Sequence, residues 1–469
     1  MHILIIGAGR IGRSVAENLV NESNDITIVD QDAERVSALE TRLDLRGVTG
    51  NALSPSVLES AGANDADMIL AVTANDETNM AVCLLASQLF NIPTRIARVR
   101  NQELRQYPRL LAEEGFQITS TIWPEQALNE SLLRLIEFPE ALQIIDFAEG
   151  KAVLFCVRAV AGSPLVGRPI GDLAVHLPHV PARIVSVFRR NRRLDISSET
   201  VIESGDEVIA LSSGRDVRRV ISELRQHEER IRRIMIAGNA RLGVQLAGLL
   251  NGPEGRRGYT ITILDEDAAL CTSLAAAVPK DTELVTANLT DEEALTELCV
   301  DRCDLFISLS SRDENNIMGA LLAKKLGAHR VIALTDSDTF SALMQGTQID
   351  VTVSSTQATI GELLRHVRRG DVLAAHSLRR GVAEALEIVA HGNKRSSKVV
   401  GKRIADIDLP EGVEIAALVR DTDDIEEPEV LIAQKDVVVE PEDRVIVFVP
   451  GKRVIPQVEK LFAVDVGFF

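Results

Sequence analysis

The sequence predicts an α/β protein with two tandem doubly wound parallel-sheet domains, each followed by a small α+β domain. The first observation is a glycine-rich turn that follows an apolar strand and opens a helix, at 7–12 and again at 238–243. The second is an acid that ends the next apolar strand, Asp30 in one half and Asp265 in the other. This order of elements is typical of a Rossmann-like dinucleotide-binding βαβ unit. Its occurrence twice separates it from an isolated glycine pattern.

Identical residues recur at a constant offset of 237 positions and extend the duplication over most of the chain. The pairs are Asn51 and Asn288, Asp67 and Asp304, Asp76 and Asp313, Glu77 and Glu314, Asn79 and Asn316, and Asp206 and Asp443. A chain of 469 residues is also too long for one core. We therefore expect nucleotide-binding domains at 1–123 and 232–348 and small domains at 140–228 and 368–455.

The first glycine turn carries the clearest binding chemistry. Gly7 allows the tight turn, Gly9 leaves room for a pyrophosphate beside the backbone, and Gly12 lets the helix pack on its strand. The helix N-terminus then holds the anion. A carboxylate at Asp30 accepts hydrogen bonds from ribose hydroxyls and repels a 2′-phosphate, which favours NAD or NADH. The alternative is a turn that serves only the strand-to-helix geometry.

The apolar strand 68–73 runs into a polar stretch, 74–79, and then into an apolar helix, 80–90. Loops that follow strands face the ligand crevice of a doubly wound sheet. Thr73 and Ala74 are therefore placed to contact the cofactor.

Three charged residues near this loop carry open alternatives. Asp76 either caps the first amides of the following helix or, with Glu77, binds the ligand. Arg98 alternates with apolar neighbours in 95–100. It either reaches a phosphate or lies solvated at the sheet edge.

The second half departs from the first at two positions. Ala240 replaces the middle glycine of the turn, and we expect its methyl group to crowd the pyrophosphate approach. The apolar pattern sets Ala333 opposite Arg98, so the second half lacks that cation. We expect unequal pockets, with the first as the dinucleotide site. The second is either vacant or accepts another adenine nucleotide.

Composition argues against several partners and sites. With 69 acidic against 51 basic residues, the net charge of −18 disfavours nucleic acid. The sequence shows neither a membrane-spanning apolar run nor a leader, so we expect a cytosolic protein. The five cysteines do not repeat between halves, which argues against a disulfide framework. Cys299 and Cys303 lack a nearby third ligand, so we expect no metal site.

Two basic clusters, at 189–193 and 225–233, interrupt this acidic chain. They are either solvated turns and linkers or contacts for anionic headgroups or a membrane subunit.

A dehydrogenase needs a proton-transferring group beside the nicotinamide, usually in a separate substrate domain. The eight histidines are scattered, the chain has two tyrosines, and a copy of the nucleotide domain stands where a catalytic domain would follow. The small domains consist of short predicted strands around turns such as 203–206. We therefore expect no catalytic residues, and we interpret the small domains as pairing or ligand-sensing modules.

The whole chain resembles the TrkA family of bacterial potassium-uptake proteins, which is built from two tandem RCK (regulator of potassium conductance) units. The match rests on 7–9, Asp30, 71–80, 91–98 and 377–385. The resemblance implies a peripheral subunit on the cytoplasmic face of the inner membrane. It also implies that the chains form a ring beneath an integral-membrane potassium-translocating subunit of the Trk type. Binding of NAD, NADH or ATP to the ring then gates potassium uptake.

By position, the resemblance also implies the residues of two binding sites. In the first half they are Gly7, Ala8, Gly9, Arg10, Ile11, Asp30, Thr73, Ala74 and Arg98. In the second half they are Gly238, Asn239, Ala240, Arg241, Leu242 and Asp265. The ring is a homo-oligomer, either a tetramer or a dimer with self-complementary faces.

Amphipathic helical patterns follow the nucleotide domains at 123–136 and 355–365. Our hypothesis is that these helices join each nucleotide domain to its small domain and carry a ligand-driven movement, which disruption of Leu132 or Leu133 would uncouple. The alternative is a packed linker helix.

Three classes of function compete. A nucleotide-responsive regulator of potassium uptake fits best, and an NAD-dependent oxidoreductase is the alternative. A redox-sensing repressor with the same nucleotide fold needs a basic DNA-reading helix, which the sequence lacks.

Overall fold

A computed structural model describes residues 1–20, 24–112, 114–226, 230–252, 258–344, 348–367, 372–378, 382–421 and 429–464. The chain forms two compact units. One comprises Met1–Ala127, Thr356–Ile415 and Val438–Phe469, and the other comprises Leu128–Ser355 and Ala416–Val437. Each half of the sequence repeat therefore contributes to both units. Of the segments that carry the family resemblance, 379–381 lies outside the described residues.

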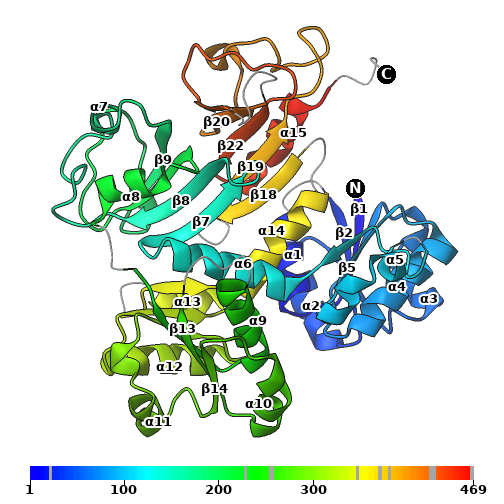
Figure 1. The fold of residues 1–469 in the computed structure, drawn as a ribbon. Coiled ribbons are helices and arrows are strands. Elements are labelled where there is room, and N and C mark those ends of the chain that lie inside the picture. The colour runs from blue at the N-terminus through cyan, green and yellow to red at the C-terminus, as the bar shows by residue number, and fades with distance from the viewer. Residues whose placement is uncertain are drawn as a thin grey trace. The chain divides into compact units, whose positions relative to one another are not determined.

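The first nucleotide domain is a six-stranded parallel sheet with the strand order β3-β2-β1-β4-β5-β6 (Figure 1). Its strands are β1 (His2–Ile6), β2 (Asp25–Asp30), β3 (Arg46–Thr49), β4 (Met68–Ala71), β5 (Thr94–Arg98) and β6 (Ser120–Ile122). The connecting helices are α1 (Arg10–Leu19), α2 (Ala33–Arg42), α3 (Pro55–Ser60), α4 (Asp76–Phe90) and α5 (Pro108–Leu111). Because the order reverses between β1 and β4, the carboxyl ends of these strands frame the position where such sheets bind ligands.

The second nucleotide domain repeats this topology with the order β14-β13-β12-β15-β16-β17, again all parallel. Its strands are β12 (Arg233–Ala237), β13 (Thr260–Asp265), β14 (Thr282–Thr286), β15 (Leu305–Ser308), β16 (Arg330–Leu334) and β17 (Val351–Val353). Its helices are α9 (Ala240–Asn251), α10 (Ala268–Leu274), α11 (Glu292–Glu297), α12 (Asp313–Lys325) and α13 (Asp338–Met344). The last strand lies beyond residue 348, where the sequence pattern placed the end of this domain.

Each small domain is built on a five-stranded sheet with the same order of counterpart strands, β10-β9-β11-β8-β7 and β21-β20-β22-β19-β18. The first contains β7 (Ala141–Phe147), β8 (Ala152–Arg158), β9 (Ala182–Arg189), β10 (Arg192–Arg193), β11 (Glu207–Ser213), α7 (Asp172–His176) and α8 (Val217–Leu224). The second contains β18 (Val372–Leu378), β19 (Ala383–Val389), β20 (Glu414–Arg420), β21 (Glu429–Ile432), β22 (Arg444–Val449) and α15 (Ile455–Phe462). These architectures confirm the predicted fold class.

The turns that lead into β11 and β22 explain one repeated residue of the small domains. Asp206 and Asp443 are each 1% exposed. Their Oδ2 atoms accept hydrogen bonds from the amides of Glu203 at 2.9 Å and Glu440 at 2.7 Å. Each buried carboxylate thus stabilises its turn by a hydrogen bond to a backbone amide three residues earlier, which explains why both halves have an aspartate at this position.

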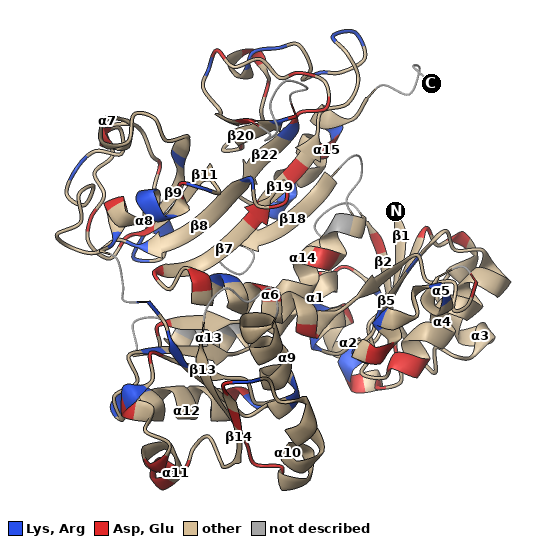
Figure 2. Ribbon diagram, viewed as in Figure 1, with Lys and Arg blue, Asp and Glu red and all other residues tan. Residues whose placement is uncertain are grey.

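Aliphatic side chains fill the cores. Ile3, Leu4, Ile5 and Ile6 on β1 are all buried, as expected for a parallel strand that helices cover on both faces. Figure 2 shows the same pattern, with the sheet strands mostly free of charge and the acids and bases gathered on helices and loops.

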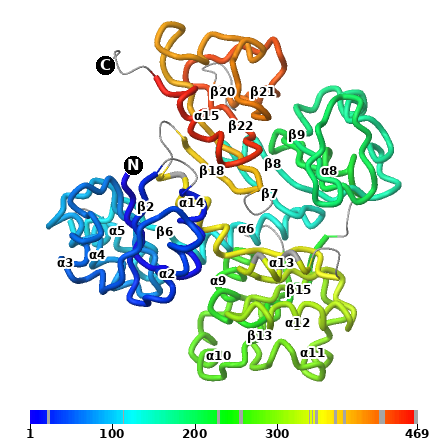
Figure 3. Tube along the Cα trace, turned by 180° about the vertical axis from the view of Figure 1, so that it is seen from behind, coloured from blue at the N-terminus to red at the C-terminus, as the bar shows by residue number. Residues whose placement is uncertain are grey.

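The helix after the first nucleotide domain, α6 (Pro124–Glu137), packs into the core of the second one. Its buried side chains contact the apolar residues of β12 and α9, and Figure 3 shows α6 beside α9. The buried residues of α6 are Leu128, Leu132, Leu135 and Ile136. The helix that we expected to carry a ligand-driven movement is therefore also part of the core of the second nucleotide domain, which follows much later in the chain.

The corresponding helix of the second half, α14 (Ser355–Val367), joins the unit of the first nucleotide domain almost entirely, from Thr356 onward. Its His366 Nε2 lies 2.8 Å from the hydroxyl of Ser120 on β6. The two helices are thus exchanged between the halves of the repeat.

Within the described part of the chain, no helix is long and apolar enough to cross a bilayer.

Candidate functional site

The first glycine turn begins where β1 ends. Gly7 has φ +106°, in the region that favours glycine, and a Cβ there would lie 3.1 Å from the backbone N and Cα of Thr73. A Cβ on Gly12 would lie 1.8 Å from the carbonyl oxygen of Gly7. Both positions therefore need glycine for the fold itself.

Gly9 differs, because a Cβ there would meet no atom within 4 Å. Gly9 has φ −72°, which any residue adopts, and stands at the N-cap of α1 with no side chain to cap the helix. The space beside this backbone is open, and the amides of the first turn of α1 face it. This is the geometry that an approaching pyrophosphate needs.

Asp30 lies beside the turn, as the sequence predicts. Its Oδ2 accepts a hydrogen bond from the amide of Ala8 at 2.6 Å, and its Oδ1 accepts one from the amide of Asp32 at 2.9 Å. A carboxylate has about four acceptor positions, so these two bonds fix its orientation and leave capacity for ribose hydroxyls.

The loop after β4 is held by Asn79, which is fully buried. Its Oδ1 accepts from the amide of Thr73 at 2.9 Å and from the hydroxyl of Thr73 at 2.7 Å. Its Nδ2 donates to the carbonyl oxygens of Thr73 at 3.2 Å and Arg98 at 2.9 Å. Asn79 therefore clamps the carboxyl ends of β4 and β5 together.

The structure contradicts the capping role expected for Asp76 and gives this residue a bracing role. Asn75 caps α4, with its Oδ1 accepting from the amide of Thr78 at 2.7 Å. Asp76 Oδ2 instead accepts from the amides of Arg100 at 2.8 Å and Asn101 at 2.9 Å. It braces the loop after β5, because its position one residue inside the helix directs the carboxylate at that loop.

Arg98, at the end of β5, lies in the network and not at a solvated edge. Its Nη1 donates to the carbonyl oxygen of Thr73 at 3.3 Å, and its buried Nε has no hydrogen-bond partner among the described residues. Burial lowers the pKa of the Arg98 guanidinium, the neighbouring charge of Arg100 lowers it further, and Asp76 acts in the opposite direction. A partly desolvated cation gains from an anionic partner, which fits a phosphate.

The structure thus brings Gly7, Ala8, Asp30, Thr73 and Arg98 into one connected group. The other predicted residues take lesser places in it. The carbonyl oxygen of Ala74 accepts from Arg100 Nη2, and Ile11, in the first turn of α1, is buried. The charge of Arg10 acts on Arg98, which places it near the same group.

The second turn has a different conformation, which corrects the role expected for Ala240. α9 begins at Ala240, whereas α1 begins at Arg10, one residue later in the repeat. Ala240 is therefore helical and 0% exposed, and its methyl group packs in the core. It does not crowd the pyrophosphate approach.

What alters the second site is hydrogen bonding. Asn239 caps α9, with its Oδ1 accepting from the amide of Leu242 at 3.0 Å. Asp265 Oδ2 accepts from the amide of Ala240 at 2.7 Å, and Asp265 is only 8% exposed. Two amides that an anion would use are thus already satisfied. Arg241 is exposed.

Two further differences separate the second turn from the first. A Cβ on Gly238 would lie 2.7 Å from Leu289 Cδ2, and the first half has the smaller Ala52 at the matching position. Asn316 donates to the carbonyl oxygen of Leu334 at 3.0 Å, as Asn79 does to that of Arg98. The counterpart of Arg98 is therefore Leu334, and the expected pairing with Ala333 was wrong by one residue. The second half still lacks the cation.

No group of metal-ligating side chains occurs in the described part of the chain. Cys299 is exposed and Cys303 is buried, and the other three cysteines are buried as well. Burial raises the pKa of the Cys83 and Cys303 thiols to about 12.

Sequence reasoning missed the structural roles of three residues: the clamp made by Asn79, the helix cap made by Asn239 and the contact of Arg100 with Ala74. Only Asn79 left a signal, since it repeats at Asn316, which makes equivalent bonds to Ser310 and Leu334. Asn239 stood in the turn, but its capping role depends on where the helix starts. Nothing local marks Arg100, because its contact with Ala74 crosses between loops.

Fold and site define the class as a tandem pair of Rossmann-type nucleotide-binding domains, each combined with a small antiparallel domain. The TrkA-N domain model matches residues 3–117 and 234–355, and the TrkA-C domain model matches residues 154–225 and 394–463. The chain belongs to the TrkA family.

Relatives match over nearly the full length. The Trk system potassium uptake protein TrkA of Halomonas elongata is 45% identical over 469 residues, covering 100% of both chains. The proteins of the same name from Vibrio alginolyticus and Haemophilus influenzae are 43% and 40% identical over 98% of both chains.

Among solved structures, the fold is similar to the RCK domain of GsuK, with a TM-score of 0.59, 20% identity and coverage of 98% of this chain and 95% of that one. It is also similar to the GsuK channel bound to NAD, with a TM-score of 0.58, 18% identity and coverage of 98% and 79%. At these identities the likeness concerns the fold.

Proposed function

We propose that this chain is a nucleotide-responsive regulatory subunit of a potassium-uptake system and that it binds NAD or NADH at the first glycine turn. Its relatives at 40–45% identity are named as Trk system potassium uptake proteins. The observation that carries the binding proposal is the open space beside Gly9, which has Asp30 on one side and Arg98 in the same group.

Each group in the first site has a role in this proposal. The amides of the turn and of the first turn of α1 receive the pyrophosphate. Asp30 accepts from ribose hydroxyls, and Arg98 pairs with a phosphate. ATP shares the adenosine and phosphate groups and is a further candidate ligand. The proposed residues are Gly7, Ala8, Gly9, Arg10, Ile11, Asp30, Thr73, Ala74 and Arg98.

The second turn does not bind a dinucleotide in the same way in this proposal. Its cap, its bonded aspartate and the Leu289 side chain occupy positions that are open in the first half. In this proposal the second turn mainly stabilises the fold, and an adenine nucleotide that binds there has to displace the Asn239 cap of α9. The residues concerned are Gly238, Asn239, Ala240, Arg241, Leu242 and Asp265.

The partner in this proposal is an integral-membrane potassium-translocating subunit of the Trk type. The chain lies against it as a peripheral homo-oligomer, a tetramer or a dimer, on the cytoplasmic face of the inner membrane. Ligand binding gates transport by favouring one conformation over another. We also propose four domains at 1–123, 140–228, 232–353 and 368–462. The third and fourth ranges are extended from the predicted ends at 348 and 455 to include β17 and α15.

The alternative, an NAD-dependent oxidoreductase, requires a proton-transferring group beside the cofactor. The polar groups around the first turn are engaged in holding the loops together, as with Asn79 and Asp76. We therefore propose binding without turnover and no catalytic residues.

The first test is Gly9→Ala, examined by calorimetry with NADH on the full chain. The added methyl group meets no protein atom, so the thermal midpoint should move by no more than roughly 2 °C. The same methyl stands where the pyrophosphate approaches, so NADH affinity should fall at least about tenfold. Gly248→Ala on α9, which also meets no atom within 4 Å, is the matched control and should bind normally.

Equal NADH affinity of Gly9→Ala and the unaltered chain would place the ligand elsewhere. Steady consumption of NADH would favour the oxidoreductase. Deletion of the gene should abolish high-rate potassium uptake, and the Gly9→Ala chain should restore assembly without normal nucleotide control. Uptake kinetics that stay intact after deletion would overturn the proposal.

A further inference from the structure

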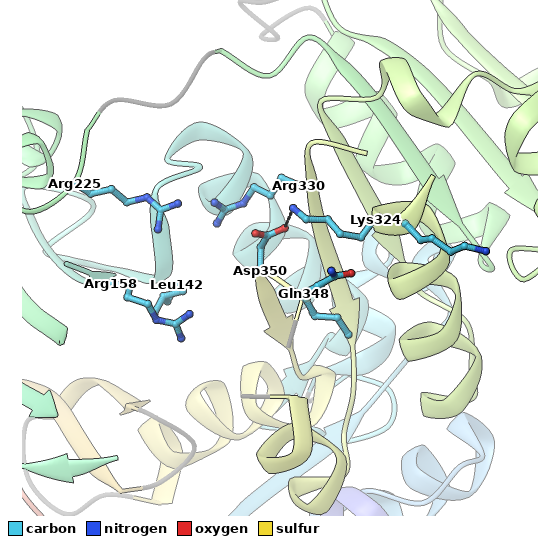
Figure 4. Close-up of a pocket in the computed structure, with 9 residues that line it drawn as sticks. Leu142, Arg158, Arg225, Lys324, Arg330, Gln348 and Asp350 are labelled. Carbon is cyan, nitrogen blue, oxygen red and sulfur yellow. Dashed lines mark hydrogen bonds and ion pairs between the residues drawn. The ribbon is translucent and has the colours of Figure 1, made fainter. Parts of the chain in front are cut away.

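A polar cavity of about 520 Å³ lies within the unit Leu128–Ser355 (Figure 4). One wall comes from the first small domain and the other from the second nucleotide domain. The lining residues are Leu142, Arg158, Arg225, Lys324, Lys325, Arg330, Gln348, Ile349 and Asp350. The volume falls within the range of small-molecule sites.

The charge of this cavity runs against that of the whole chain. Five of the nine lining residues are basic and one is acidic, in a chain whose net charge is −18. Lys324, Lys325 and Arg158 each pair with an acid, but the lining keeps an excess of positive charge, and an anion that enters reduces the repulsion between these bases. One interpretation of the basic run at 225–233 was a linker whose charges are fully solvated. Arg225 does not fit that interpretation, because it is only partly exposed and lines a cavity.

Several of the bases are held in place before any ligand arrives. Lys324 Nζ donates to Asp350 Oδ2 at 2.8 Å and to the carbonyl oxygen of His329 at 2.6 Å. Asp350 Oδ2 also accepts from the amide of Val331 at 2.8 Å. Arg330 is 4% exposed and donates from Nη2 to the carbonyl oxygen of Ala141 at 2.9 Å. These bonds fix the wall on the nucleotide-domain side.

The opposite wall is less constrained. Arg158 pairs with Glu207 at 3.2 Å and remains partly exposed. In Figure 4 the guanidinium groups of Arg225 and Arg330 point toward each other across the cavity. Two guanidinium forks that converge from different domains suit the several oxygens of a phosphorylated ligand.

The cavity is distinct from the glycine-turn sites. Arg330 opens β16 and Asp350 precedes β17, so the cavity lies at the amino-terminal edge of the second parallel sheet. Dinucleotides bind at the carboxyl-terminal edge of such sheets. A ligand here therefore acts independently of the proposed NAD site, and it bridges the first small domain and the second nucleotide domain.

We propose that this cavity binds a small soluble oligophosphate, a molecule with two or more linked phosphoryl groups. Leu142 and Ile349 are the apolar lining residues, so the phosphates and not an apolar ring supply most of the recognition. By bridging two domains, the ligand stabilises one arrangement of them.

The test uses inorganic triphosphate and calorimetry on the full-length chain. We expect one site per chain, and Arg225→Gln should weaken it at least about tenfold because it removes one charge-assisted pair. Arg225 is partly exposed, so this variant should fold and should bind NADH normally. Arg230→Gln, an exposed base in the same stretch, is the matched control and should retain triphosphate affinity.

Four outcomes would overturn the proposal. The first is that triphosphate does not bind at millimolar concentration, and the second is that Arg225→Gln and the unaltered chain bind it with equal affinity. The third is that Gly9→Ala loses triphosphate binding while Arg225→Gln keeps it. The fourth is that sulfate at equal ionic strength displaces the triphosphate. Vesicles containing phosphatidylglycerol distinguish a lipid source. Binding to vesicles that depends on Arg225, without binding of triphosphate, would assign the cavity to a headgroup and overturn the soluble ligand.

Discussion

One backbone amide distinguishes the two glycine turns. Asp30 accepts from Ala8, the second residue of its turn, whereas Asp265 accepts from Ala240, the third residue of its turn. The shift accompanies the earlier start of α9 and the Asn239 cap. The two turns thus differ in which amides remain for a ligand, because a helix N-terminus offers only a few unpaired donors.

The cysteines should differ sharply in reactivity toward a thiol reagent such as DTNB. Only thiolates react, and burial raises the pKa of Cys83 and Cys303 to about 12. Cys156 and Cys271 are also buried, whereas Cys299 is exposed. We expect one rapidly reacting thiol per native chain, and Cys299→Ser should remove it. Two or more fast thiols in the native protein would contradict the described packing.

His376 should make stability depend on pH. It lies on β18, where its Nδ1 would be 3.6 Å from a Cβ on Gly361, and burial lowers its pKa to about 4 from an ordinary 6.5. Because the folded-state pKa is the lower one, protonation favours the unfolded chain, and stability falls as the pH drops from about 6.5 toward 4. The loss by about pH 5 should be on the order of 2 kcal/mol.

The measurement compares urea denaturation of the unaltered chain and His376→Gln at about pH 7.5 and about pH 5. The variant lacks the titrating group. The difference in free energy of unfolding between the two chains should therefore change by about 2 kcal/mol between the two pH values. A difference that is independent of pH would show that His376 titrates normally.

At the scale of elements, the exchanged helices tie the two halves of the repeat together. α6 follows the first nucleotide domain in sequence but completes the core of the second, and α14 joins the first unit. The core of the second nucleotide domain is therefore incomplete without α6, which comes from the first half of the chain. α6 follows the first nucleotide domain directly in the chain, and its residues from Leu128 onward belong to the unit of the second.

Leu132→Ala should destabilise the second nucleotide domain. Leu132 is 0% exposed in the core that α6 shares with β12 and α9, so its truncation leaves a cavity and should cost about 2–5 kcal/mol. Leu133 packs only partly against the same core, and Leu133→Ala should cost about 1 kcal/mol. Urea denaturation of both variants measures the costs.

Equal costs for the two variants would contradict this placement of α6. The contrast also matters for the hypothesis that α6 carries a ligand-driven movement. Leu132→Ala changes stability and coupling together, so Leu133→Ala is the cleaner variant in which to measure whether nucleotide control of transport is lost.

At the scale of the whole molecule, the two halves share a fold, but their glycine turns differ in hydrogen bonding. Titration of the full chain with NADH should therefore give one tight site per chain. Asn239→Ala removes the cap of α9 and should lower stability by about 1 kcal/mol without changing this stoichiometry. Two sites of equal affinity in the unaltered chain would contradict the difference between the turns.

Patterns local in the sequence determined much of this protein. Two apolar strands that end in glycine turns, followed by Asp30 and Asp265, predicted both parallel sheets and the position of each acid beside its turn. The constant offset of 237 residues predicted four domains and pointed to Asp76 and Asn79. These features follow from backbone sterics and strand periodicity over a few residues, which a sequence displays directly.

Only the tertiary structure decided which distant parts meet. It placed α6 in the core of the second domain, set Leu334 opposite Arg98, buried the methyl of Ala240 and gathered Arg225 and Arg330 around one cavity. Each outcome depends on which apolar faces pack and on where a helix begins, to within one residue. Periodicity leaves both open, because many pairings of similar faces satisfy the same pattern.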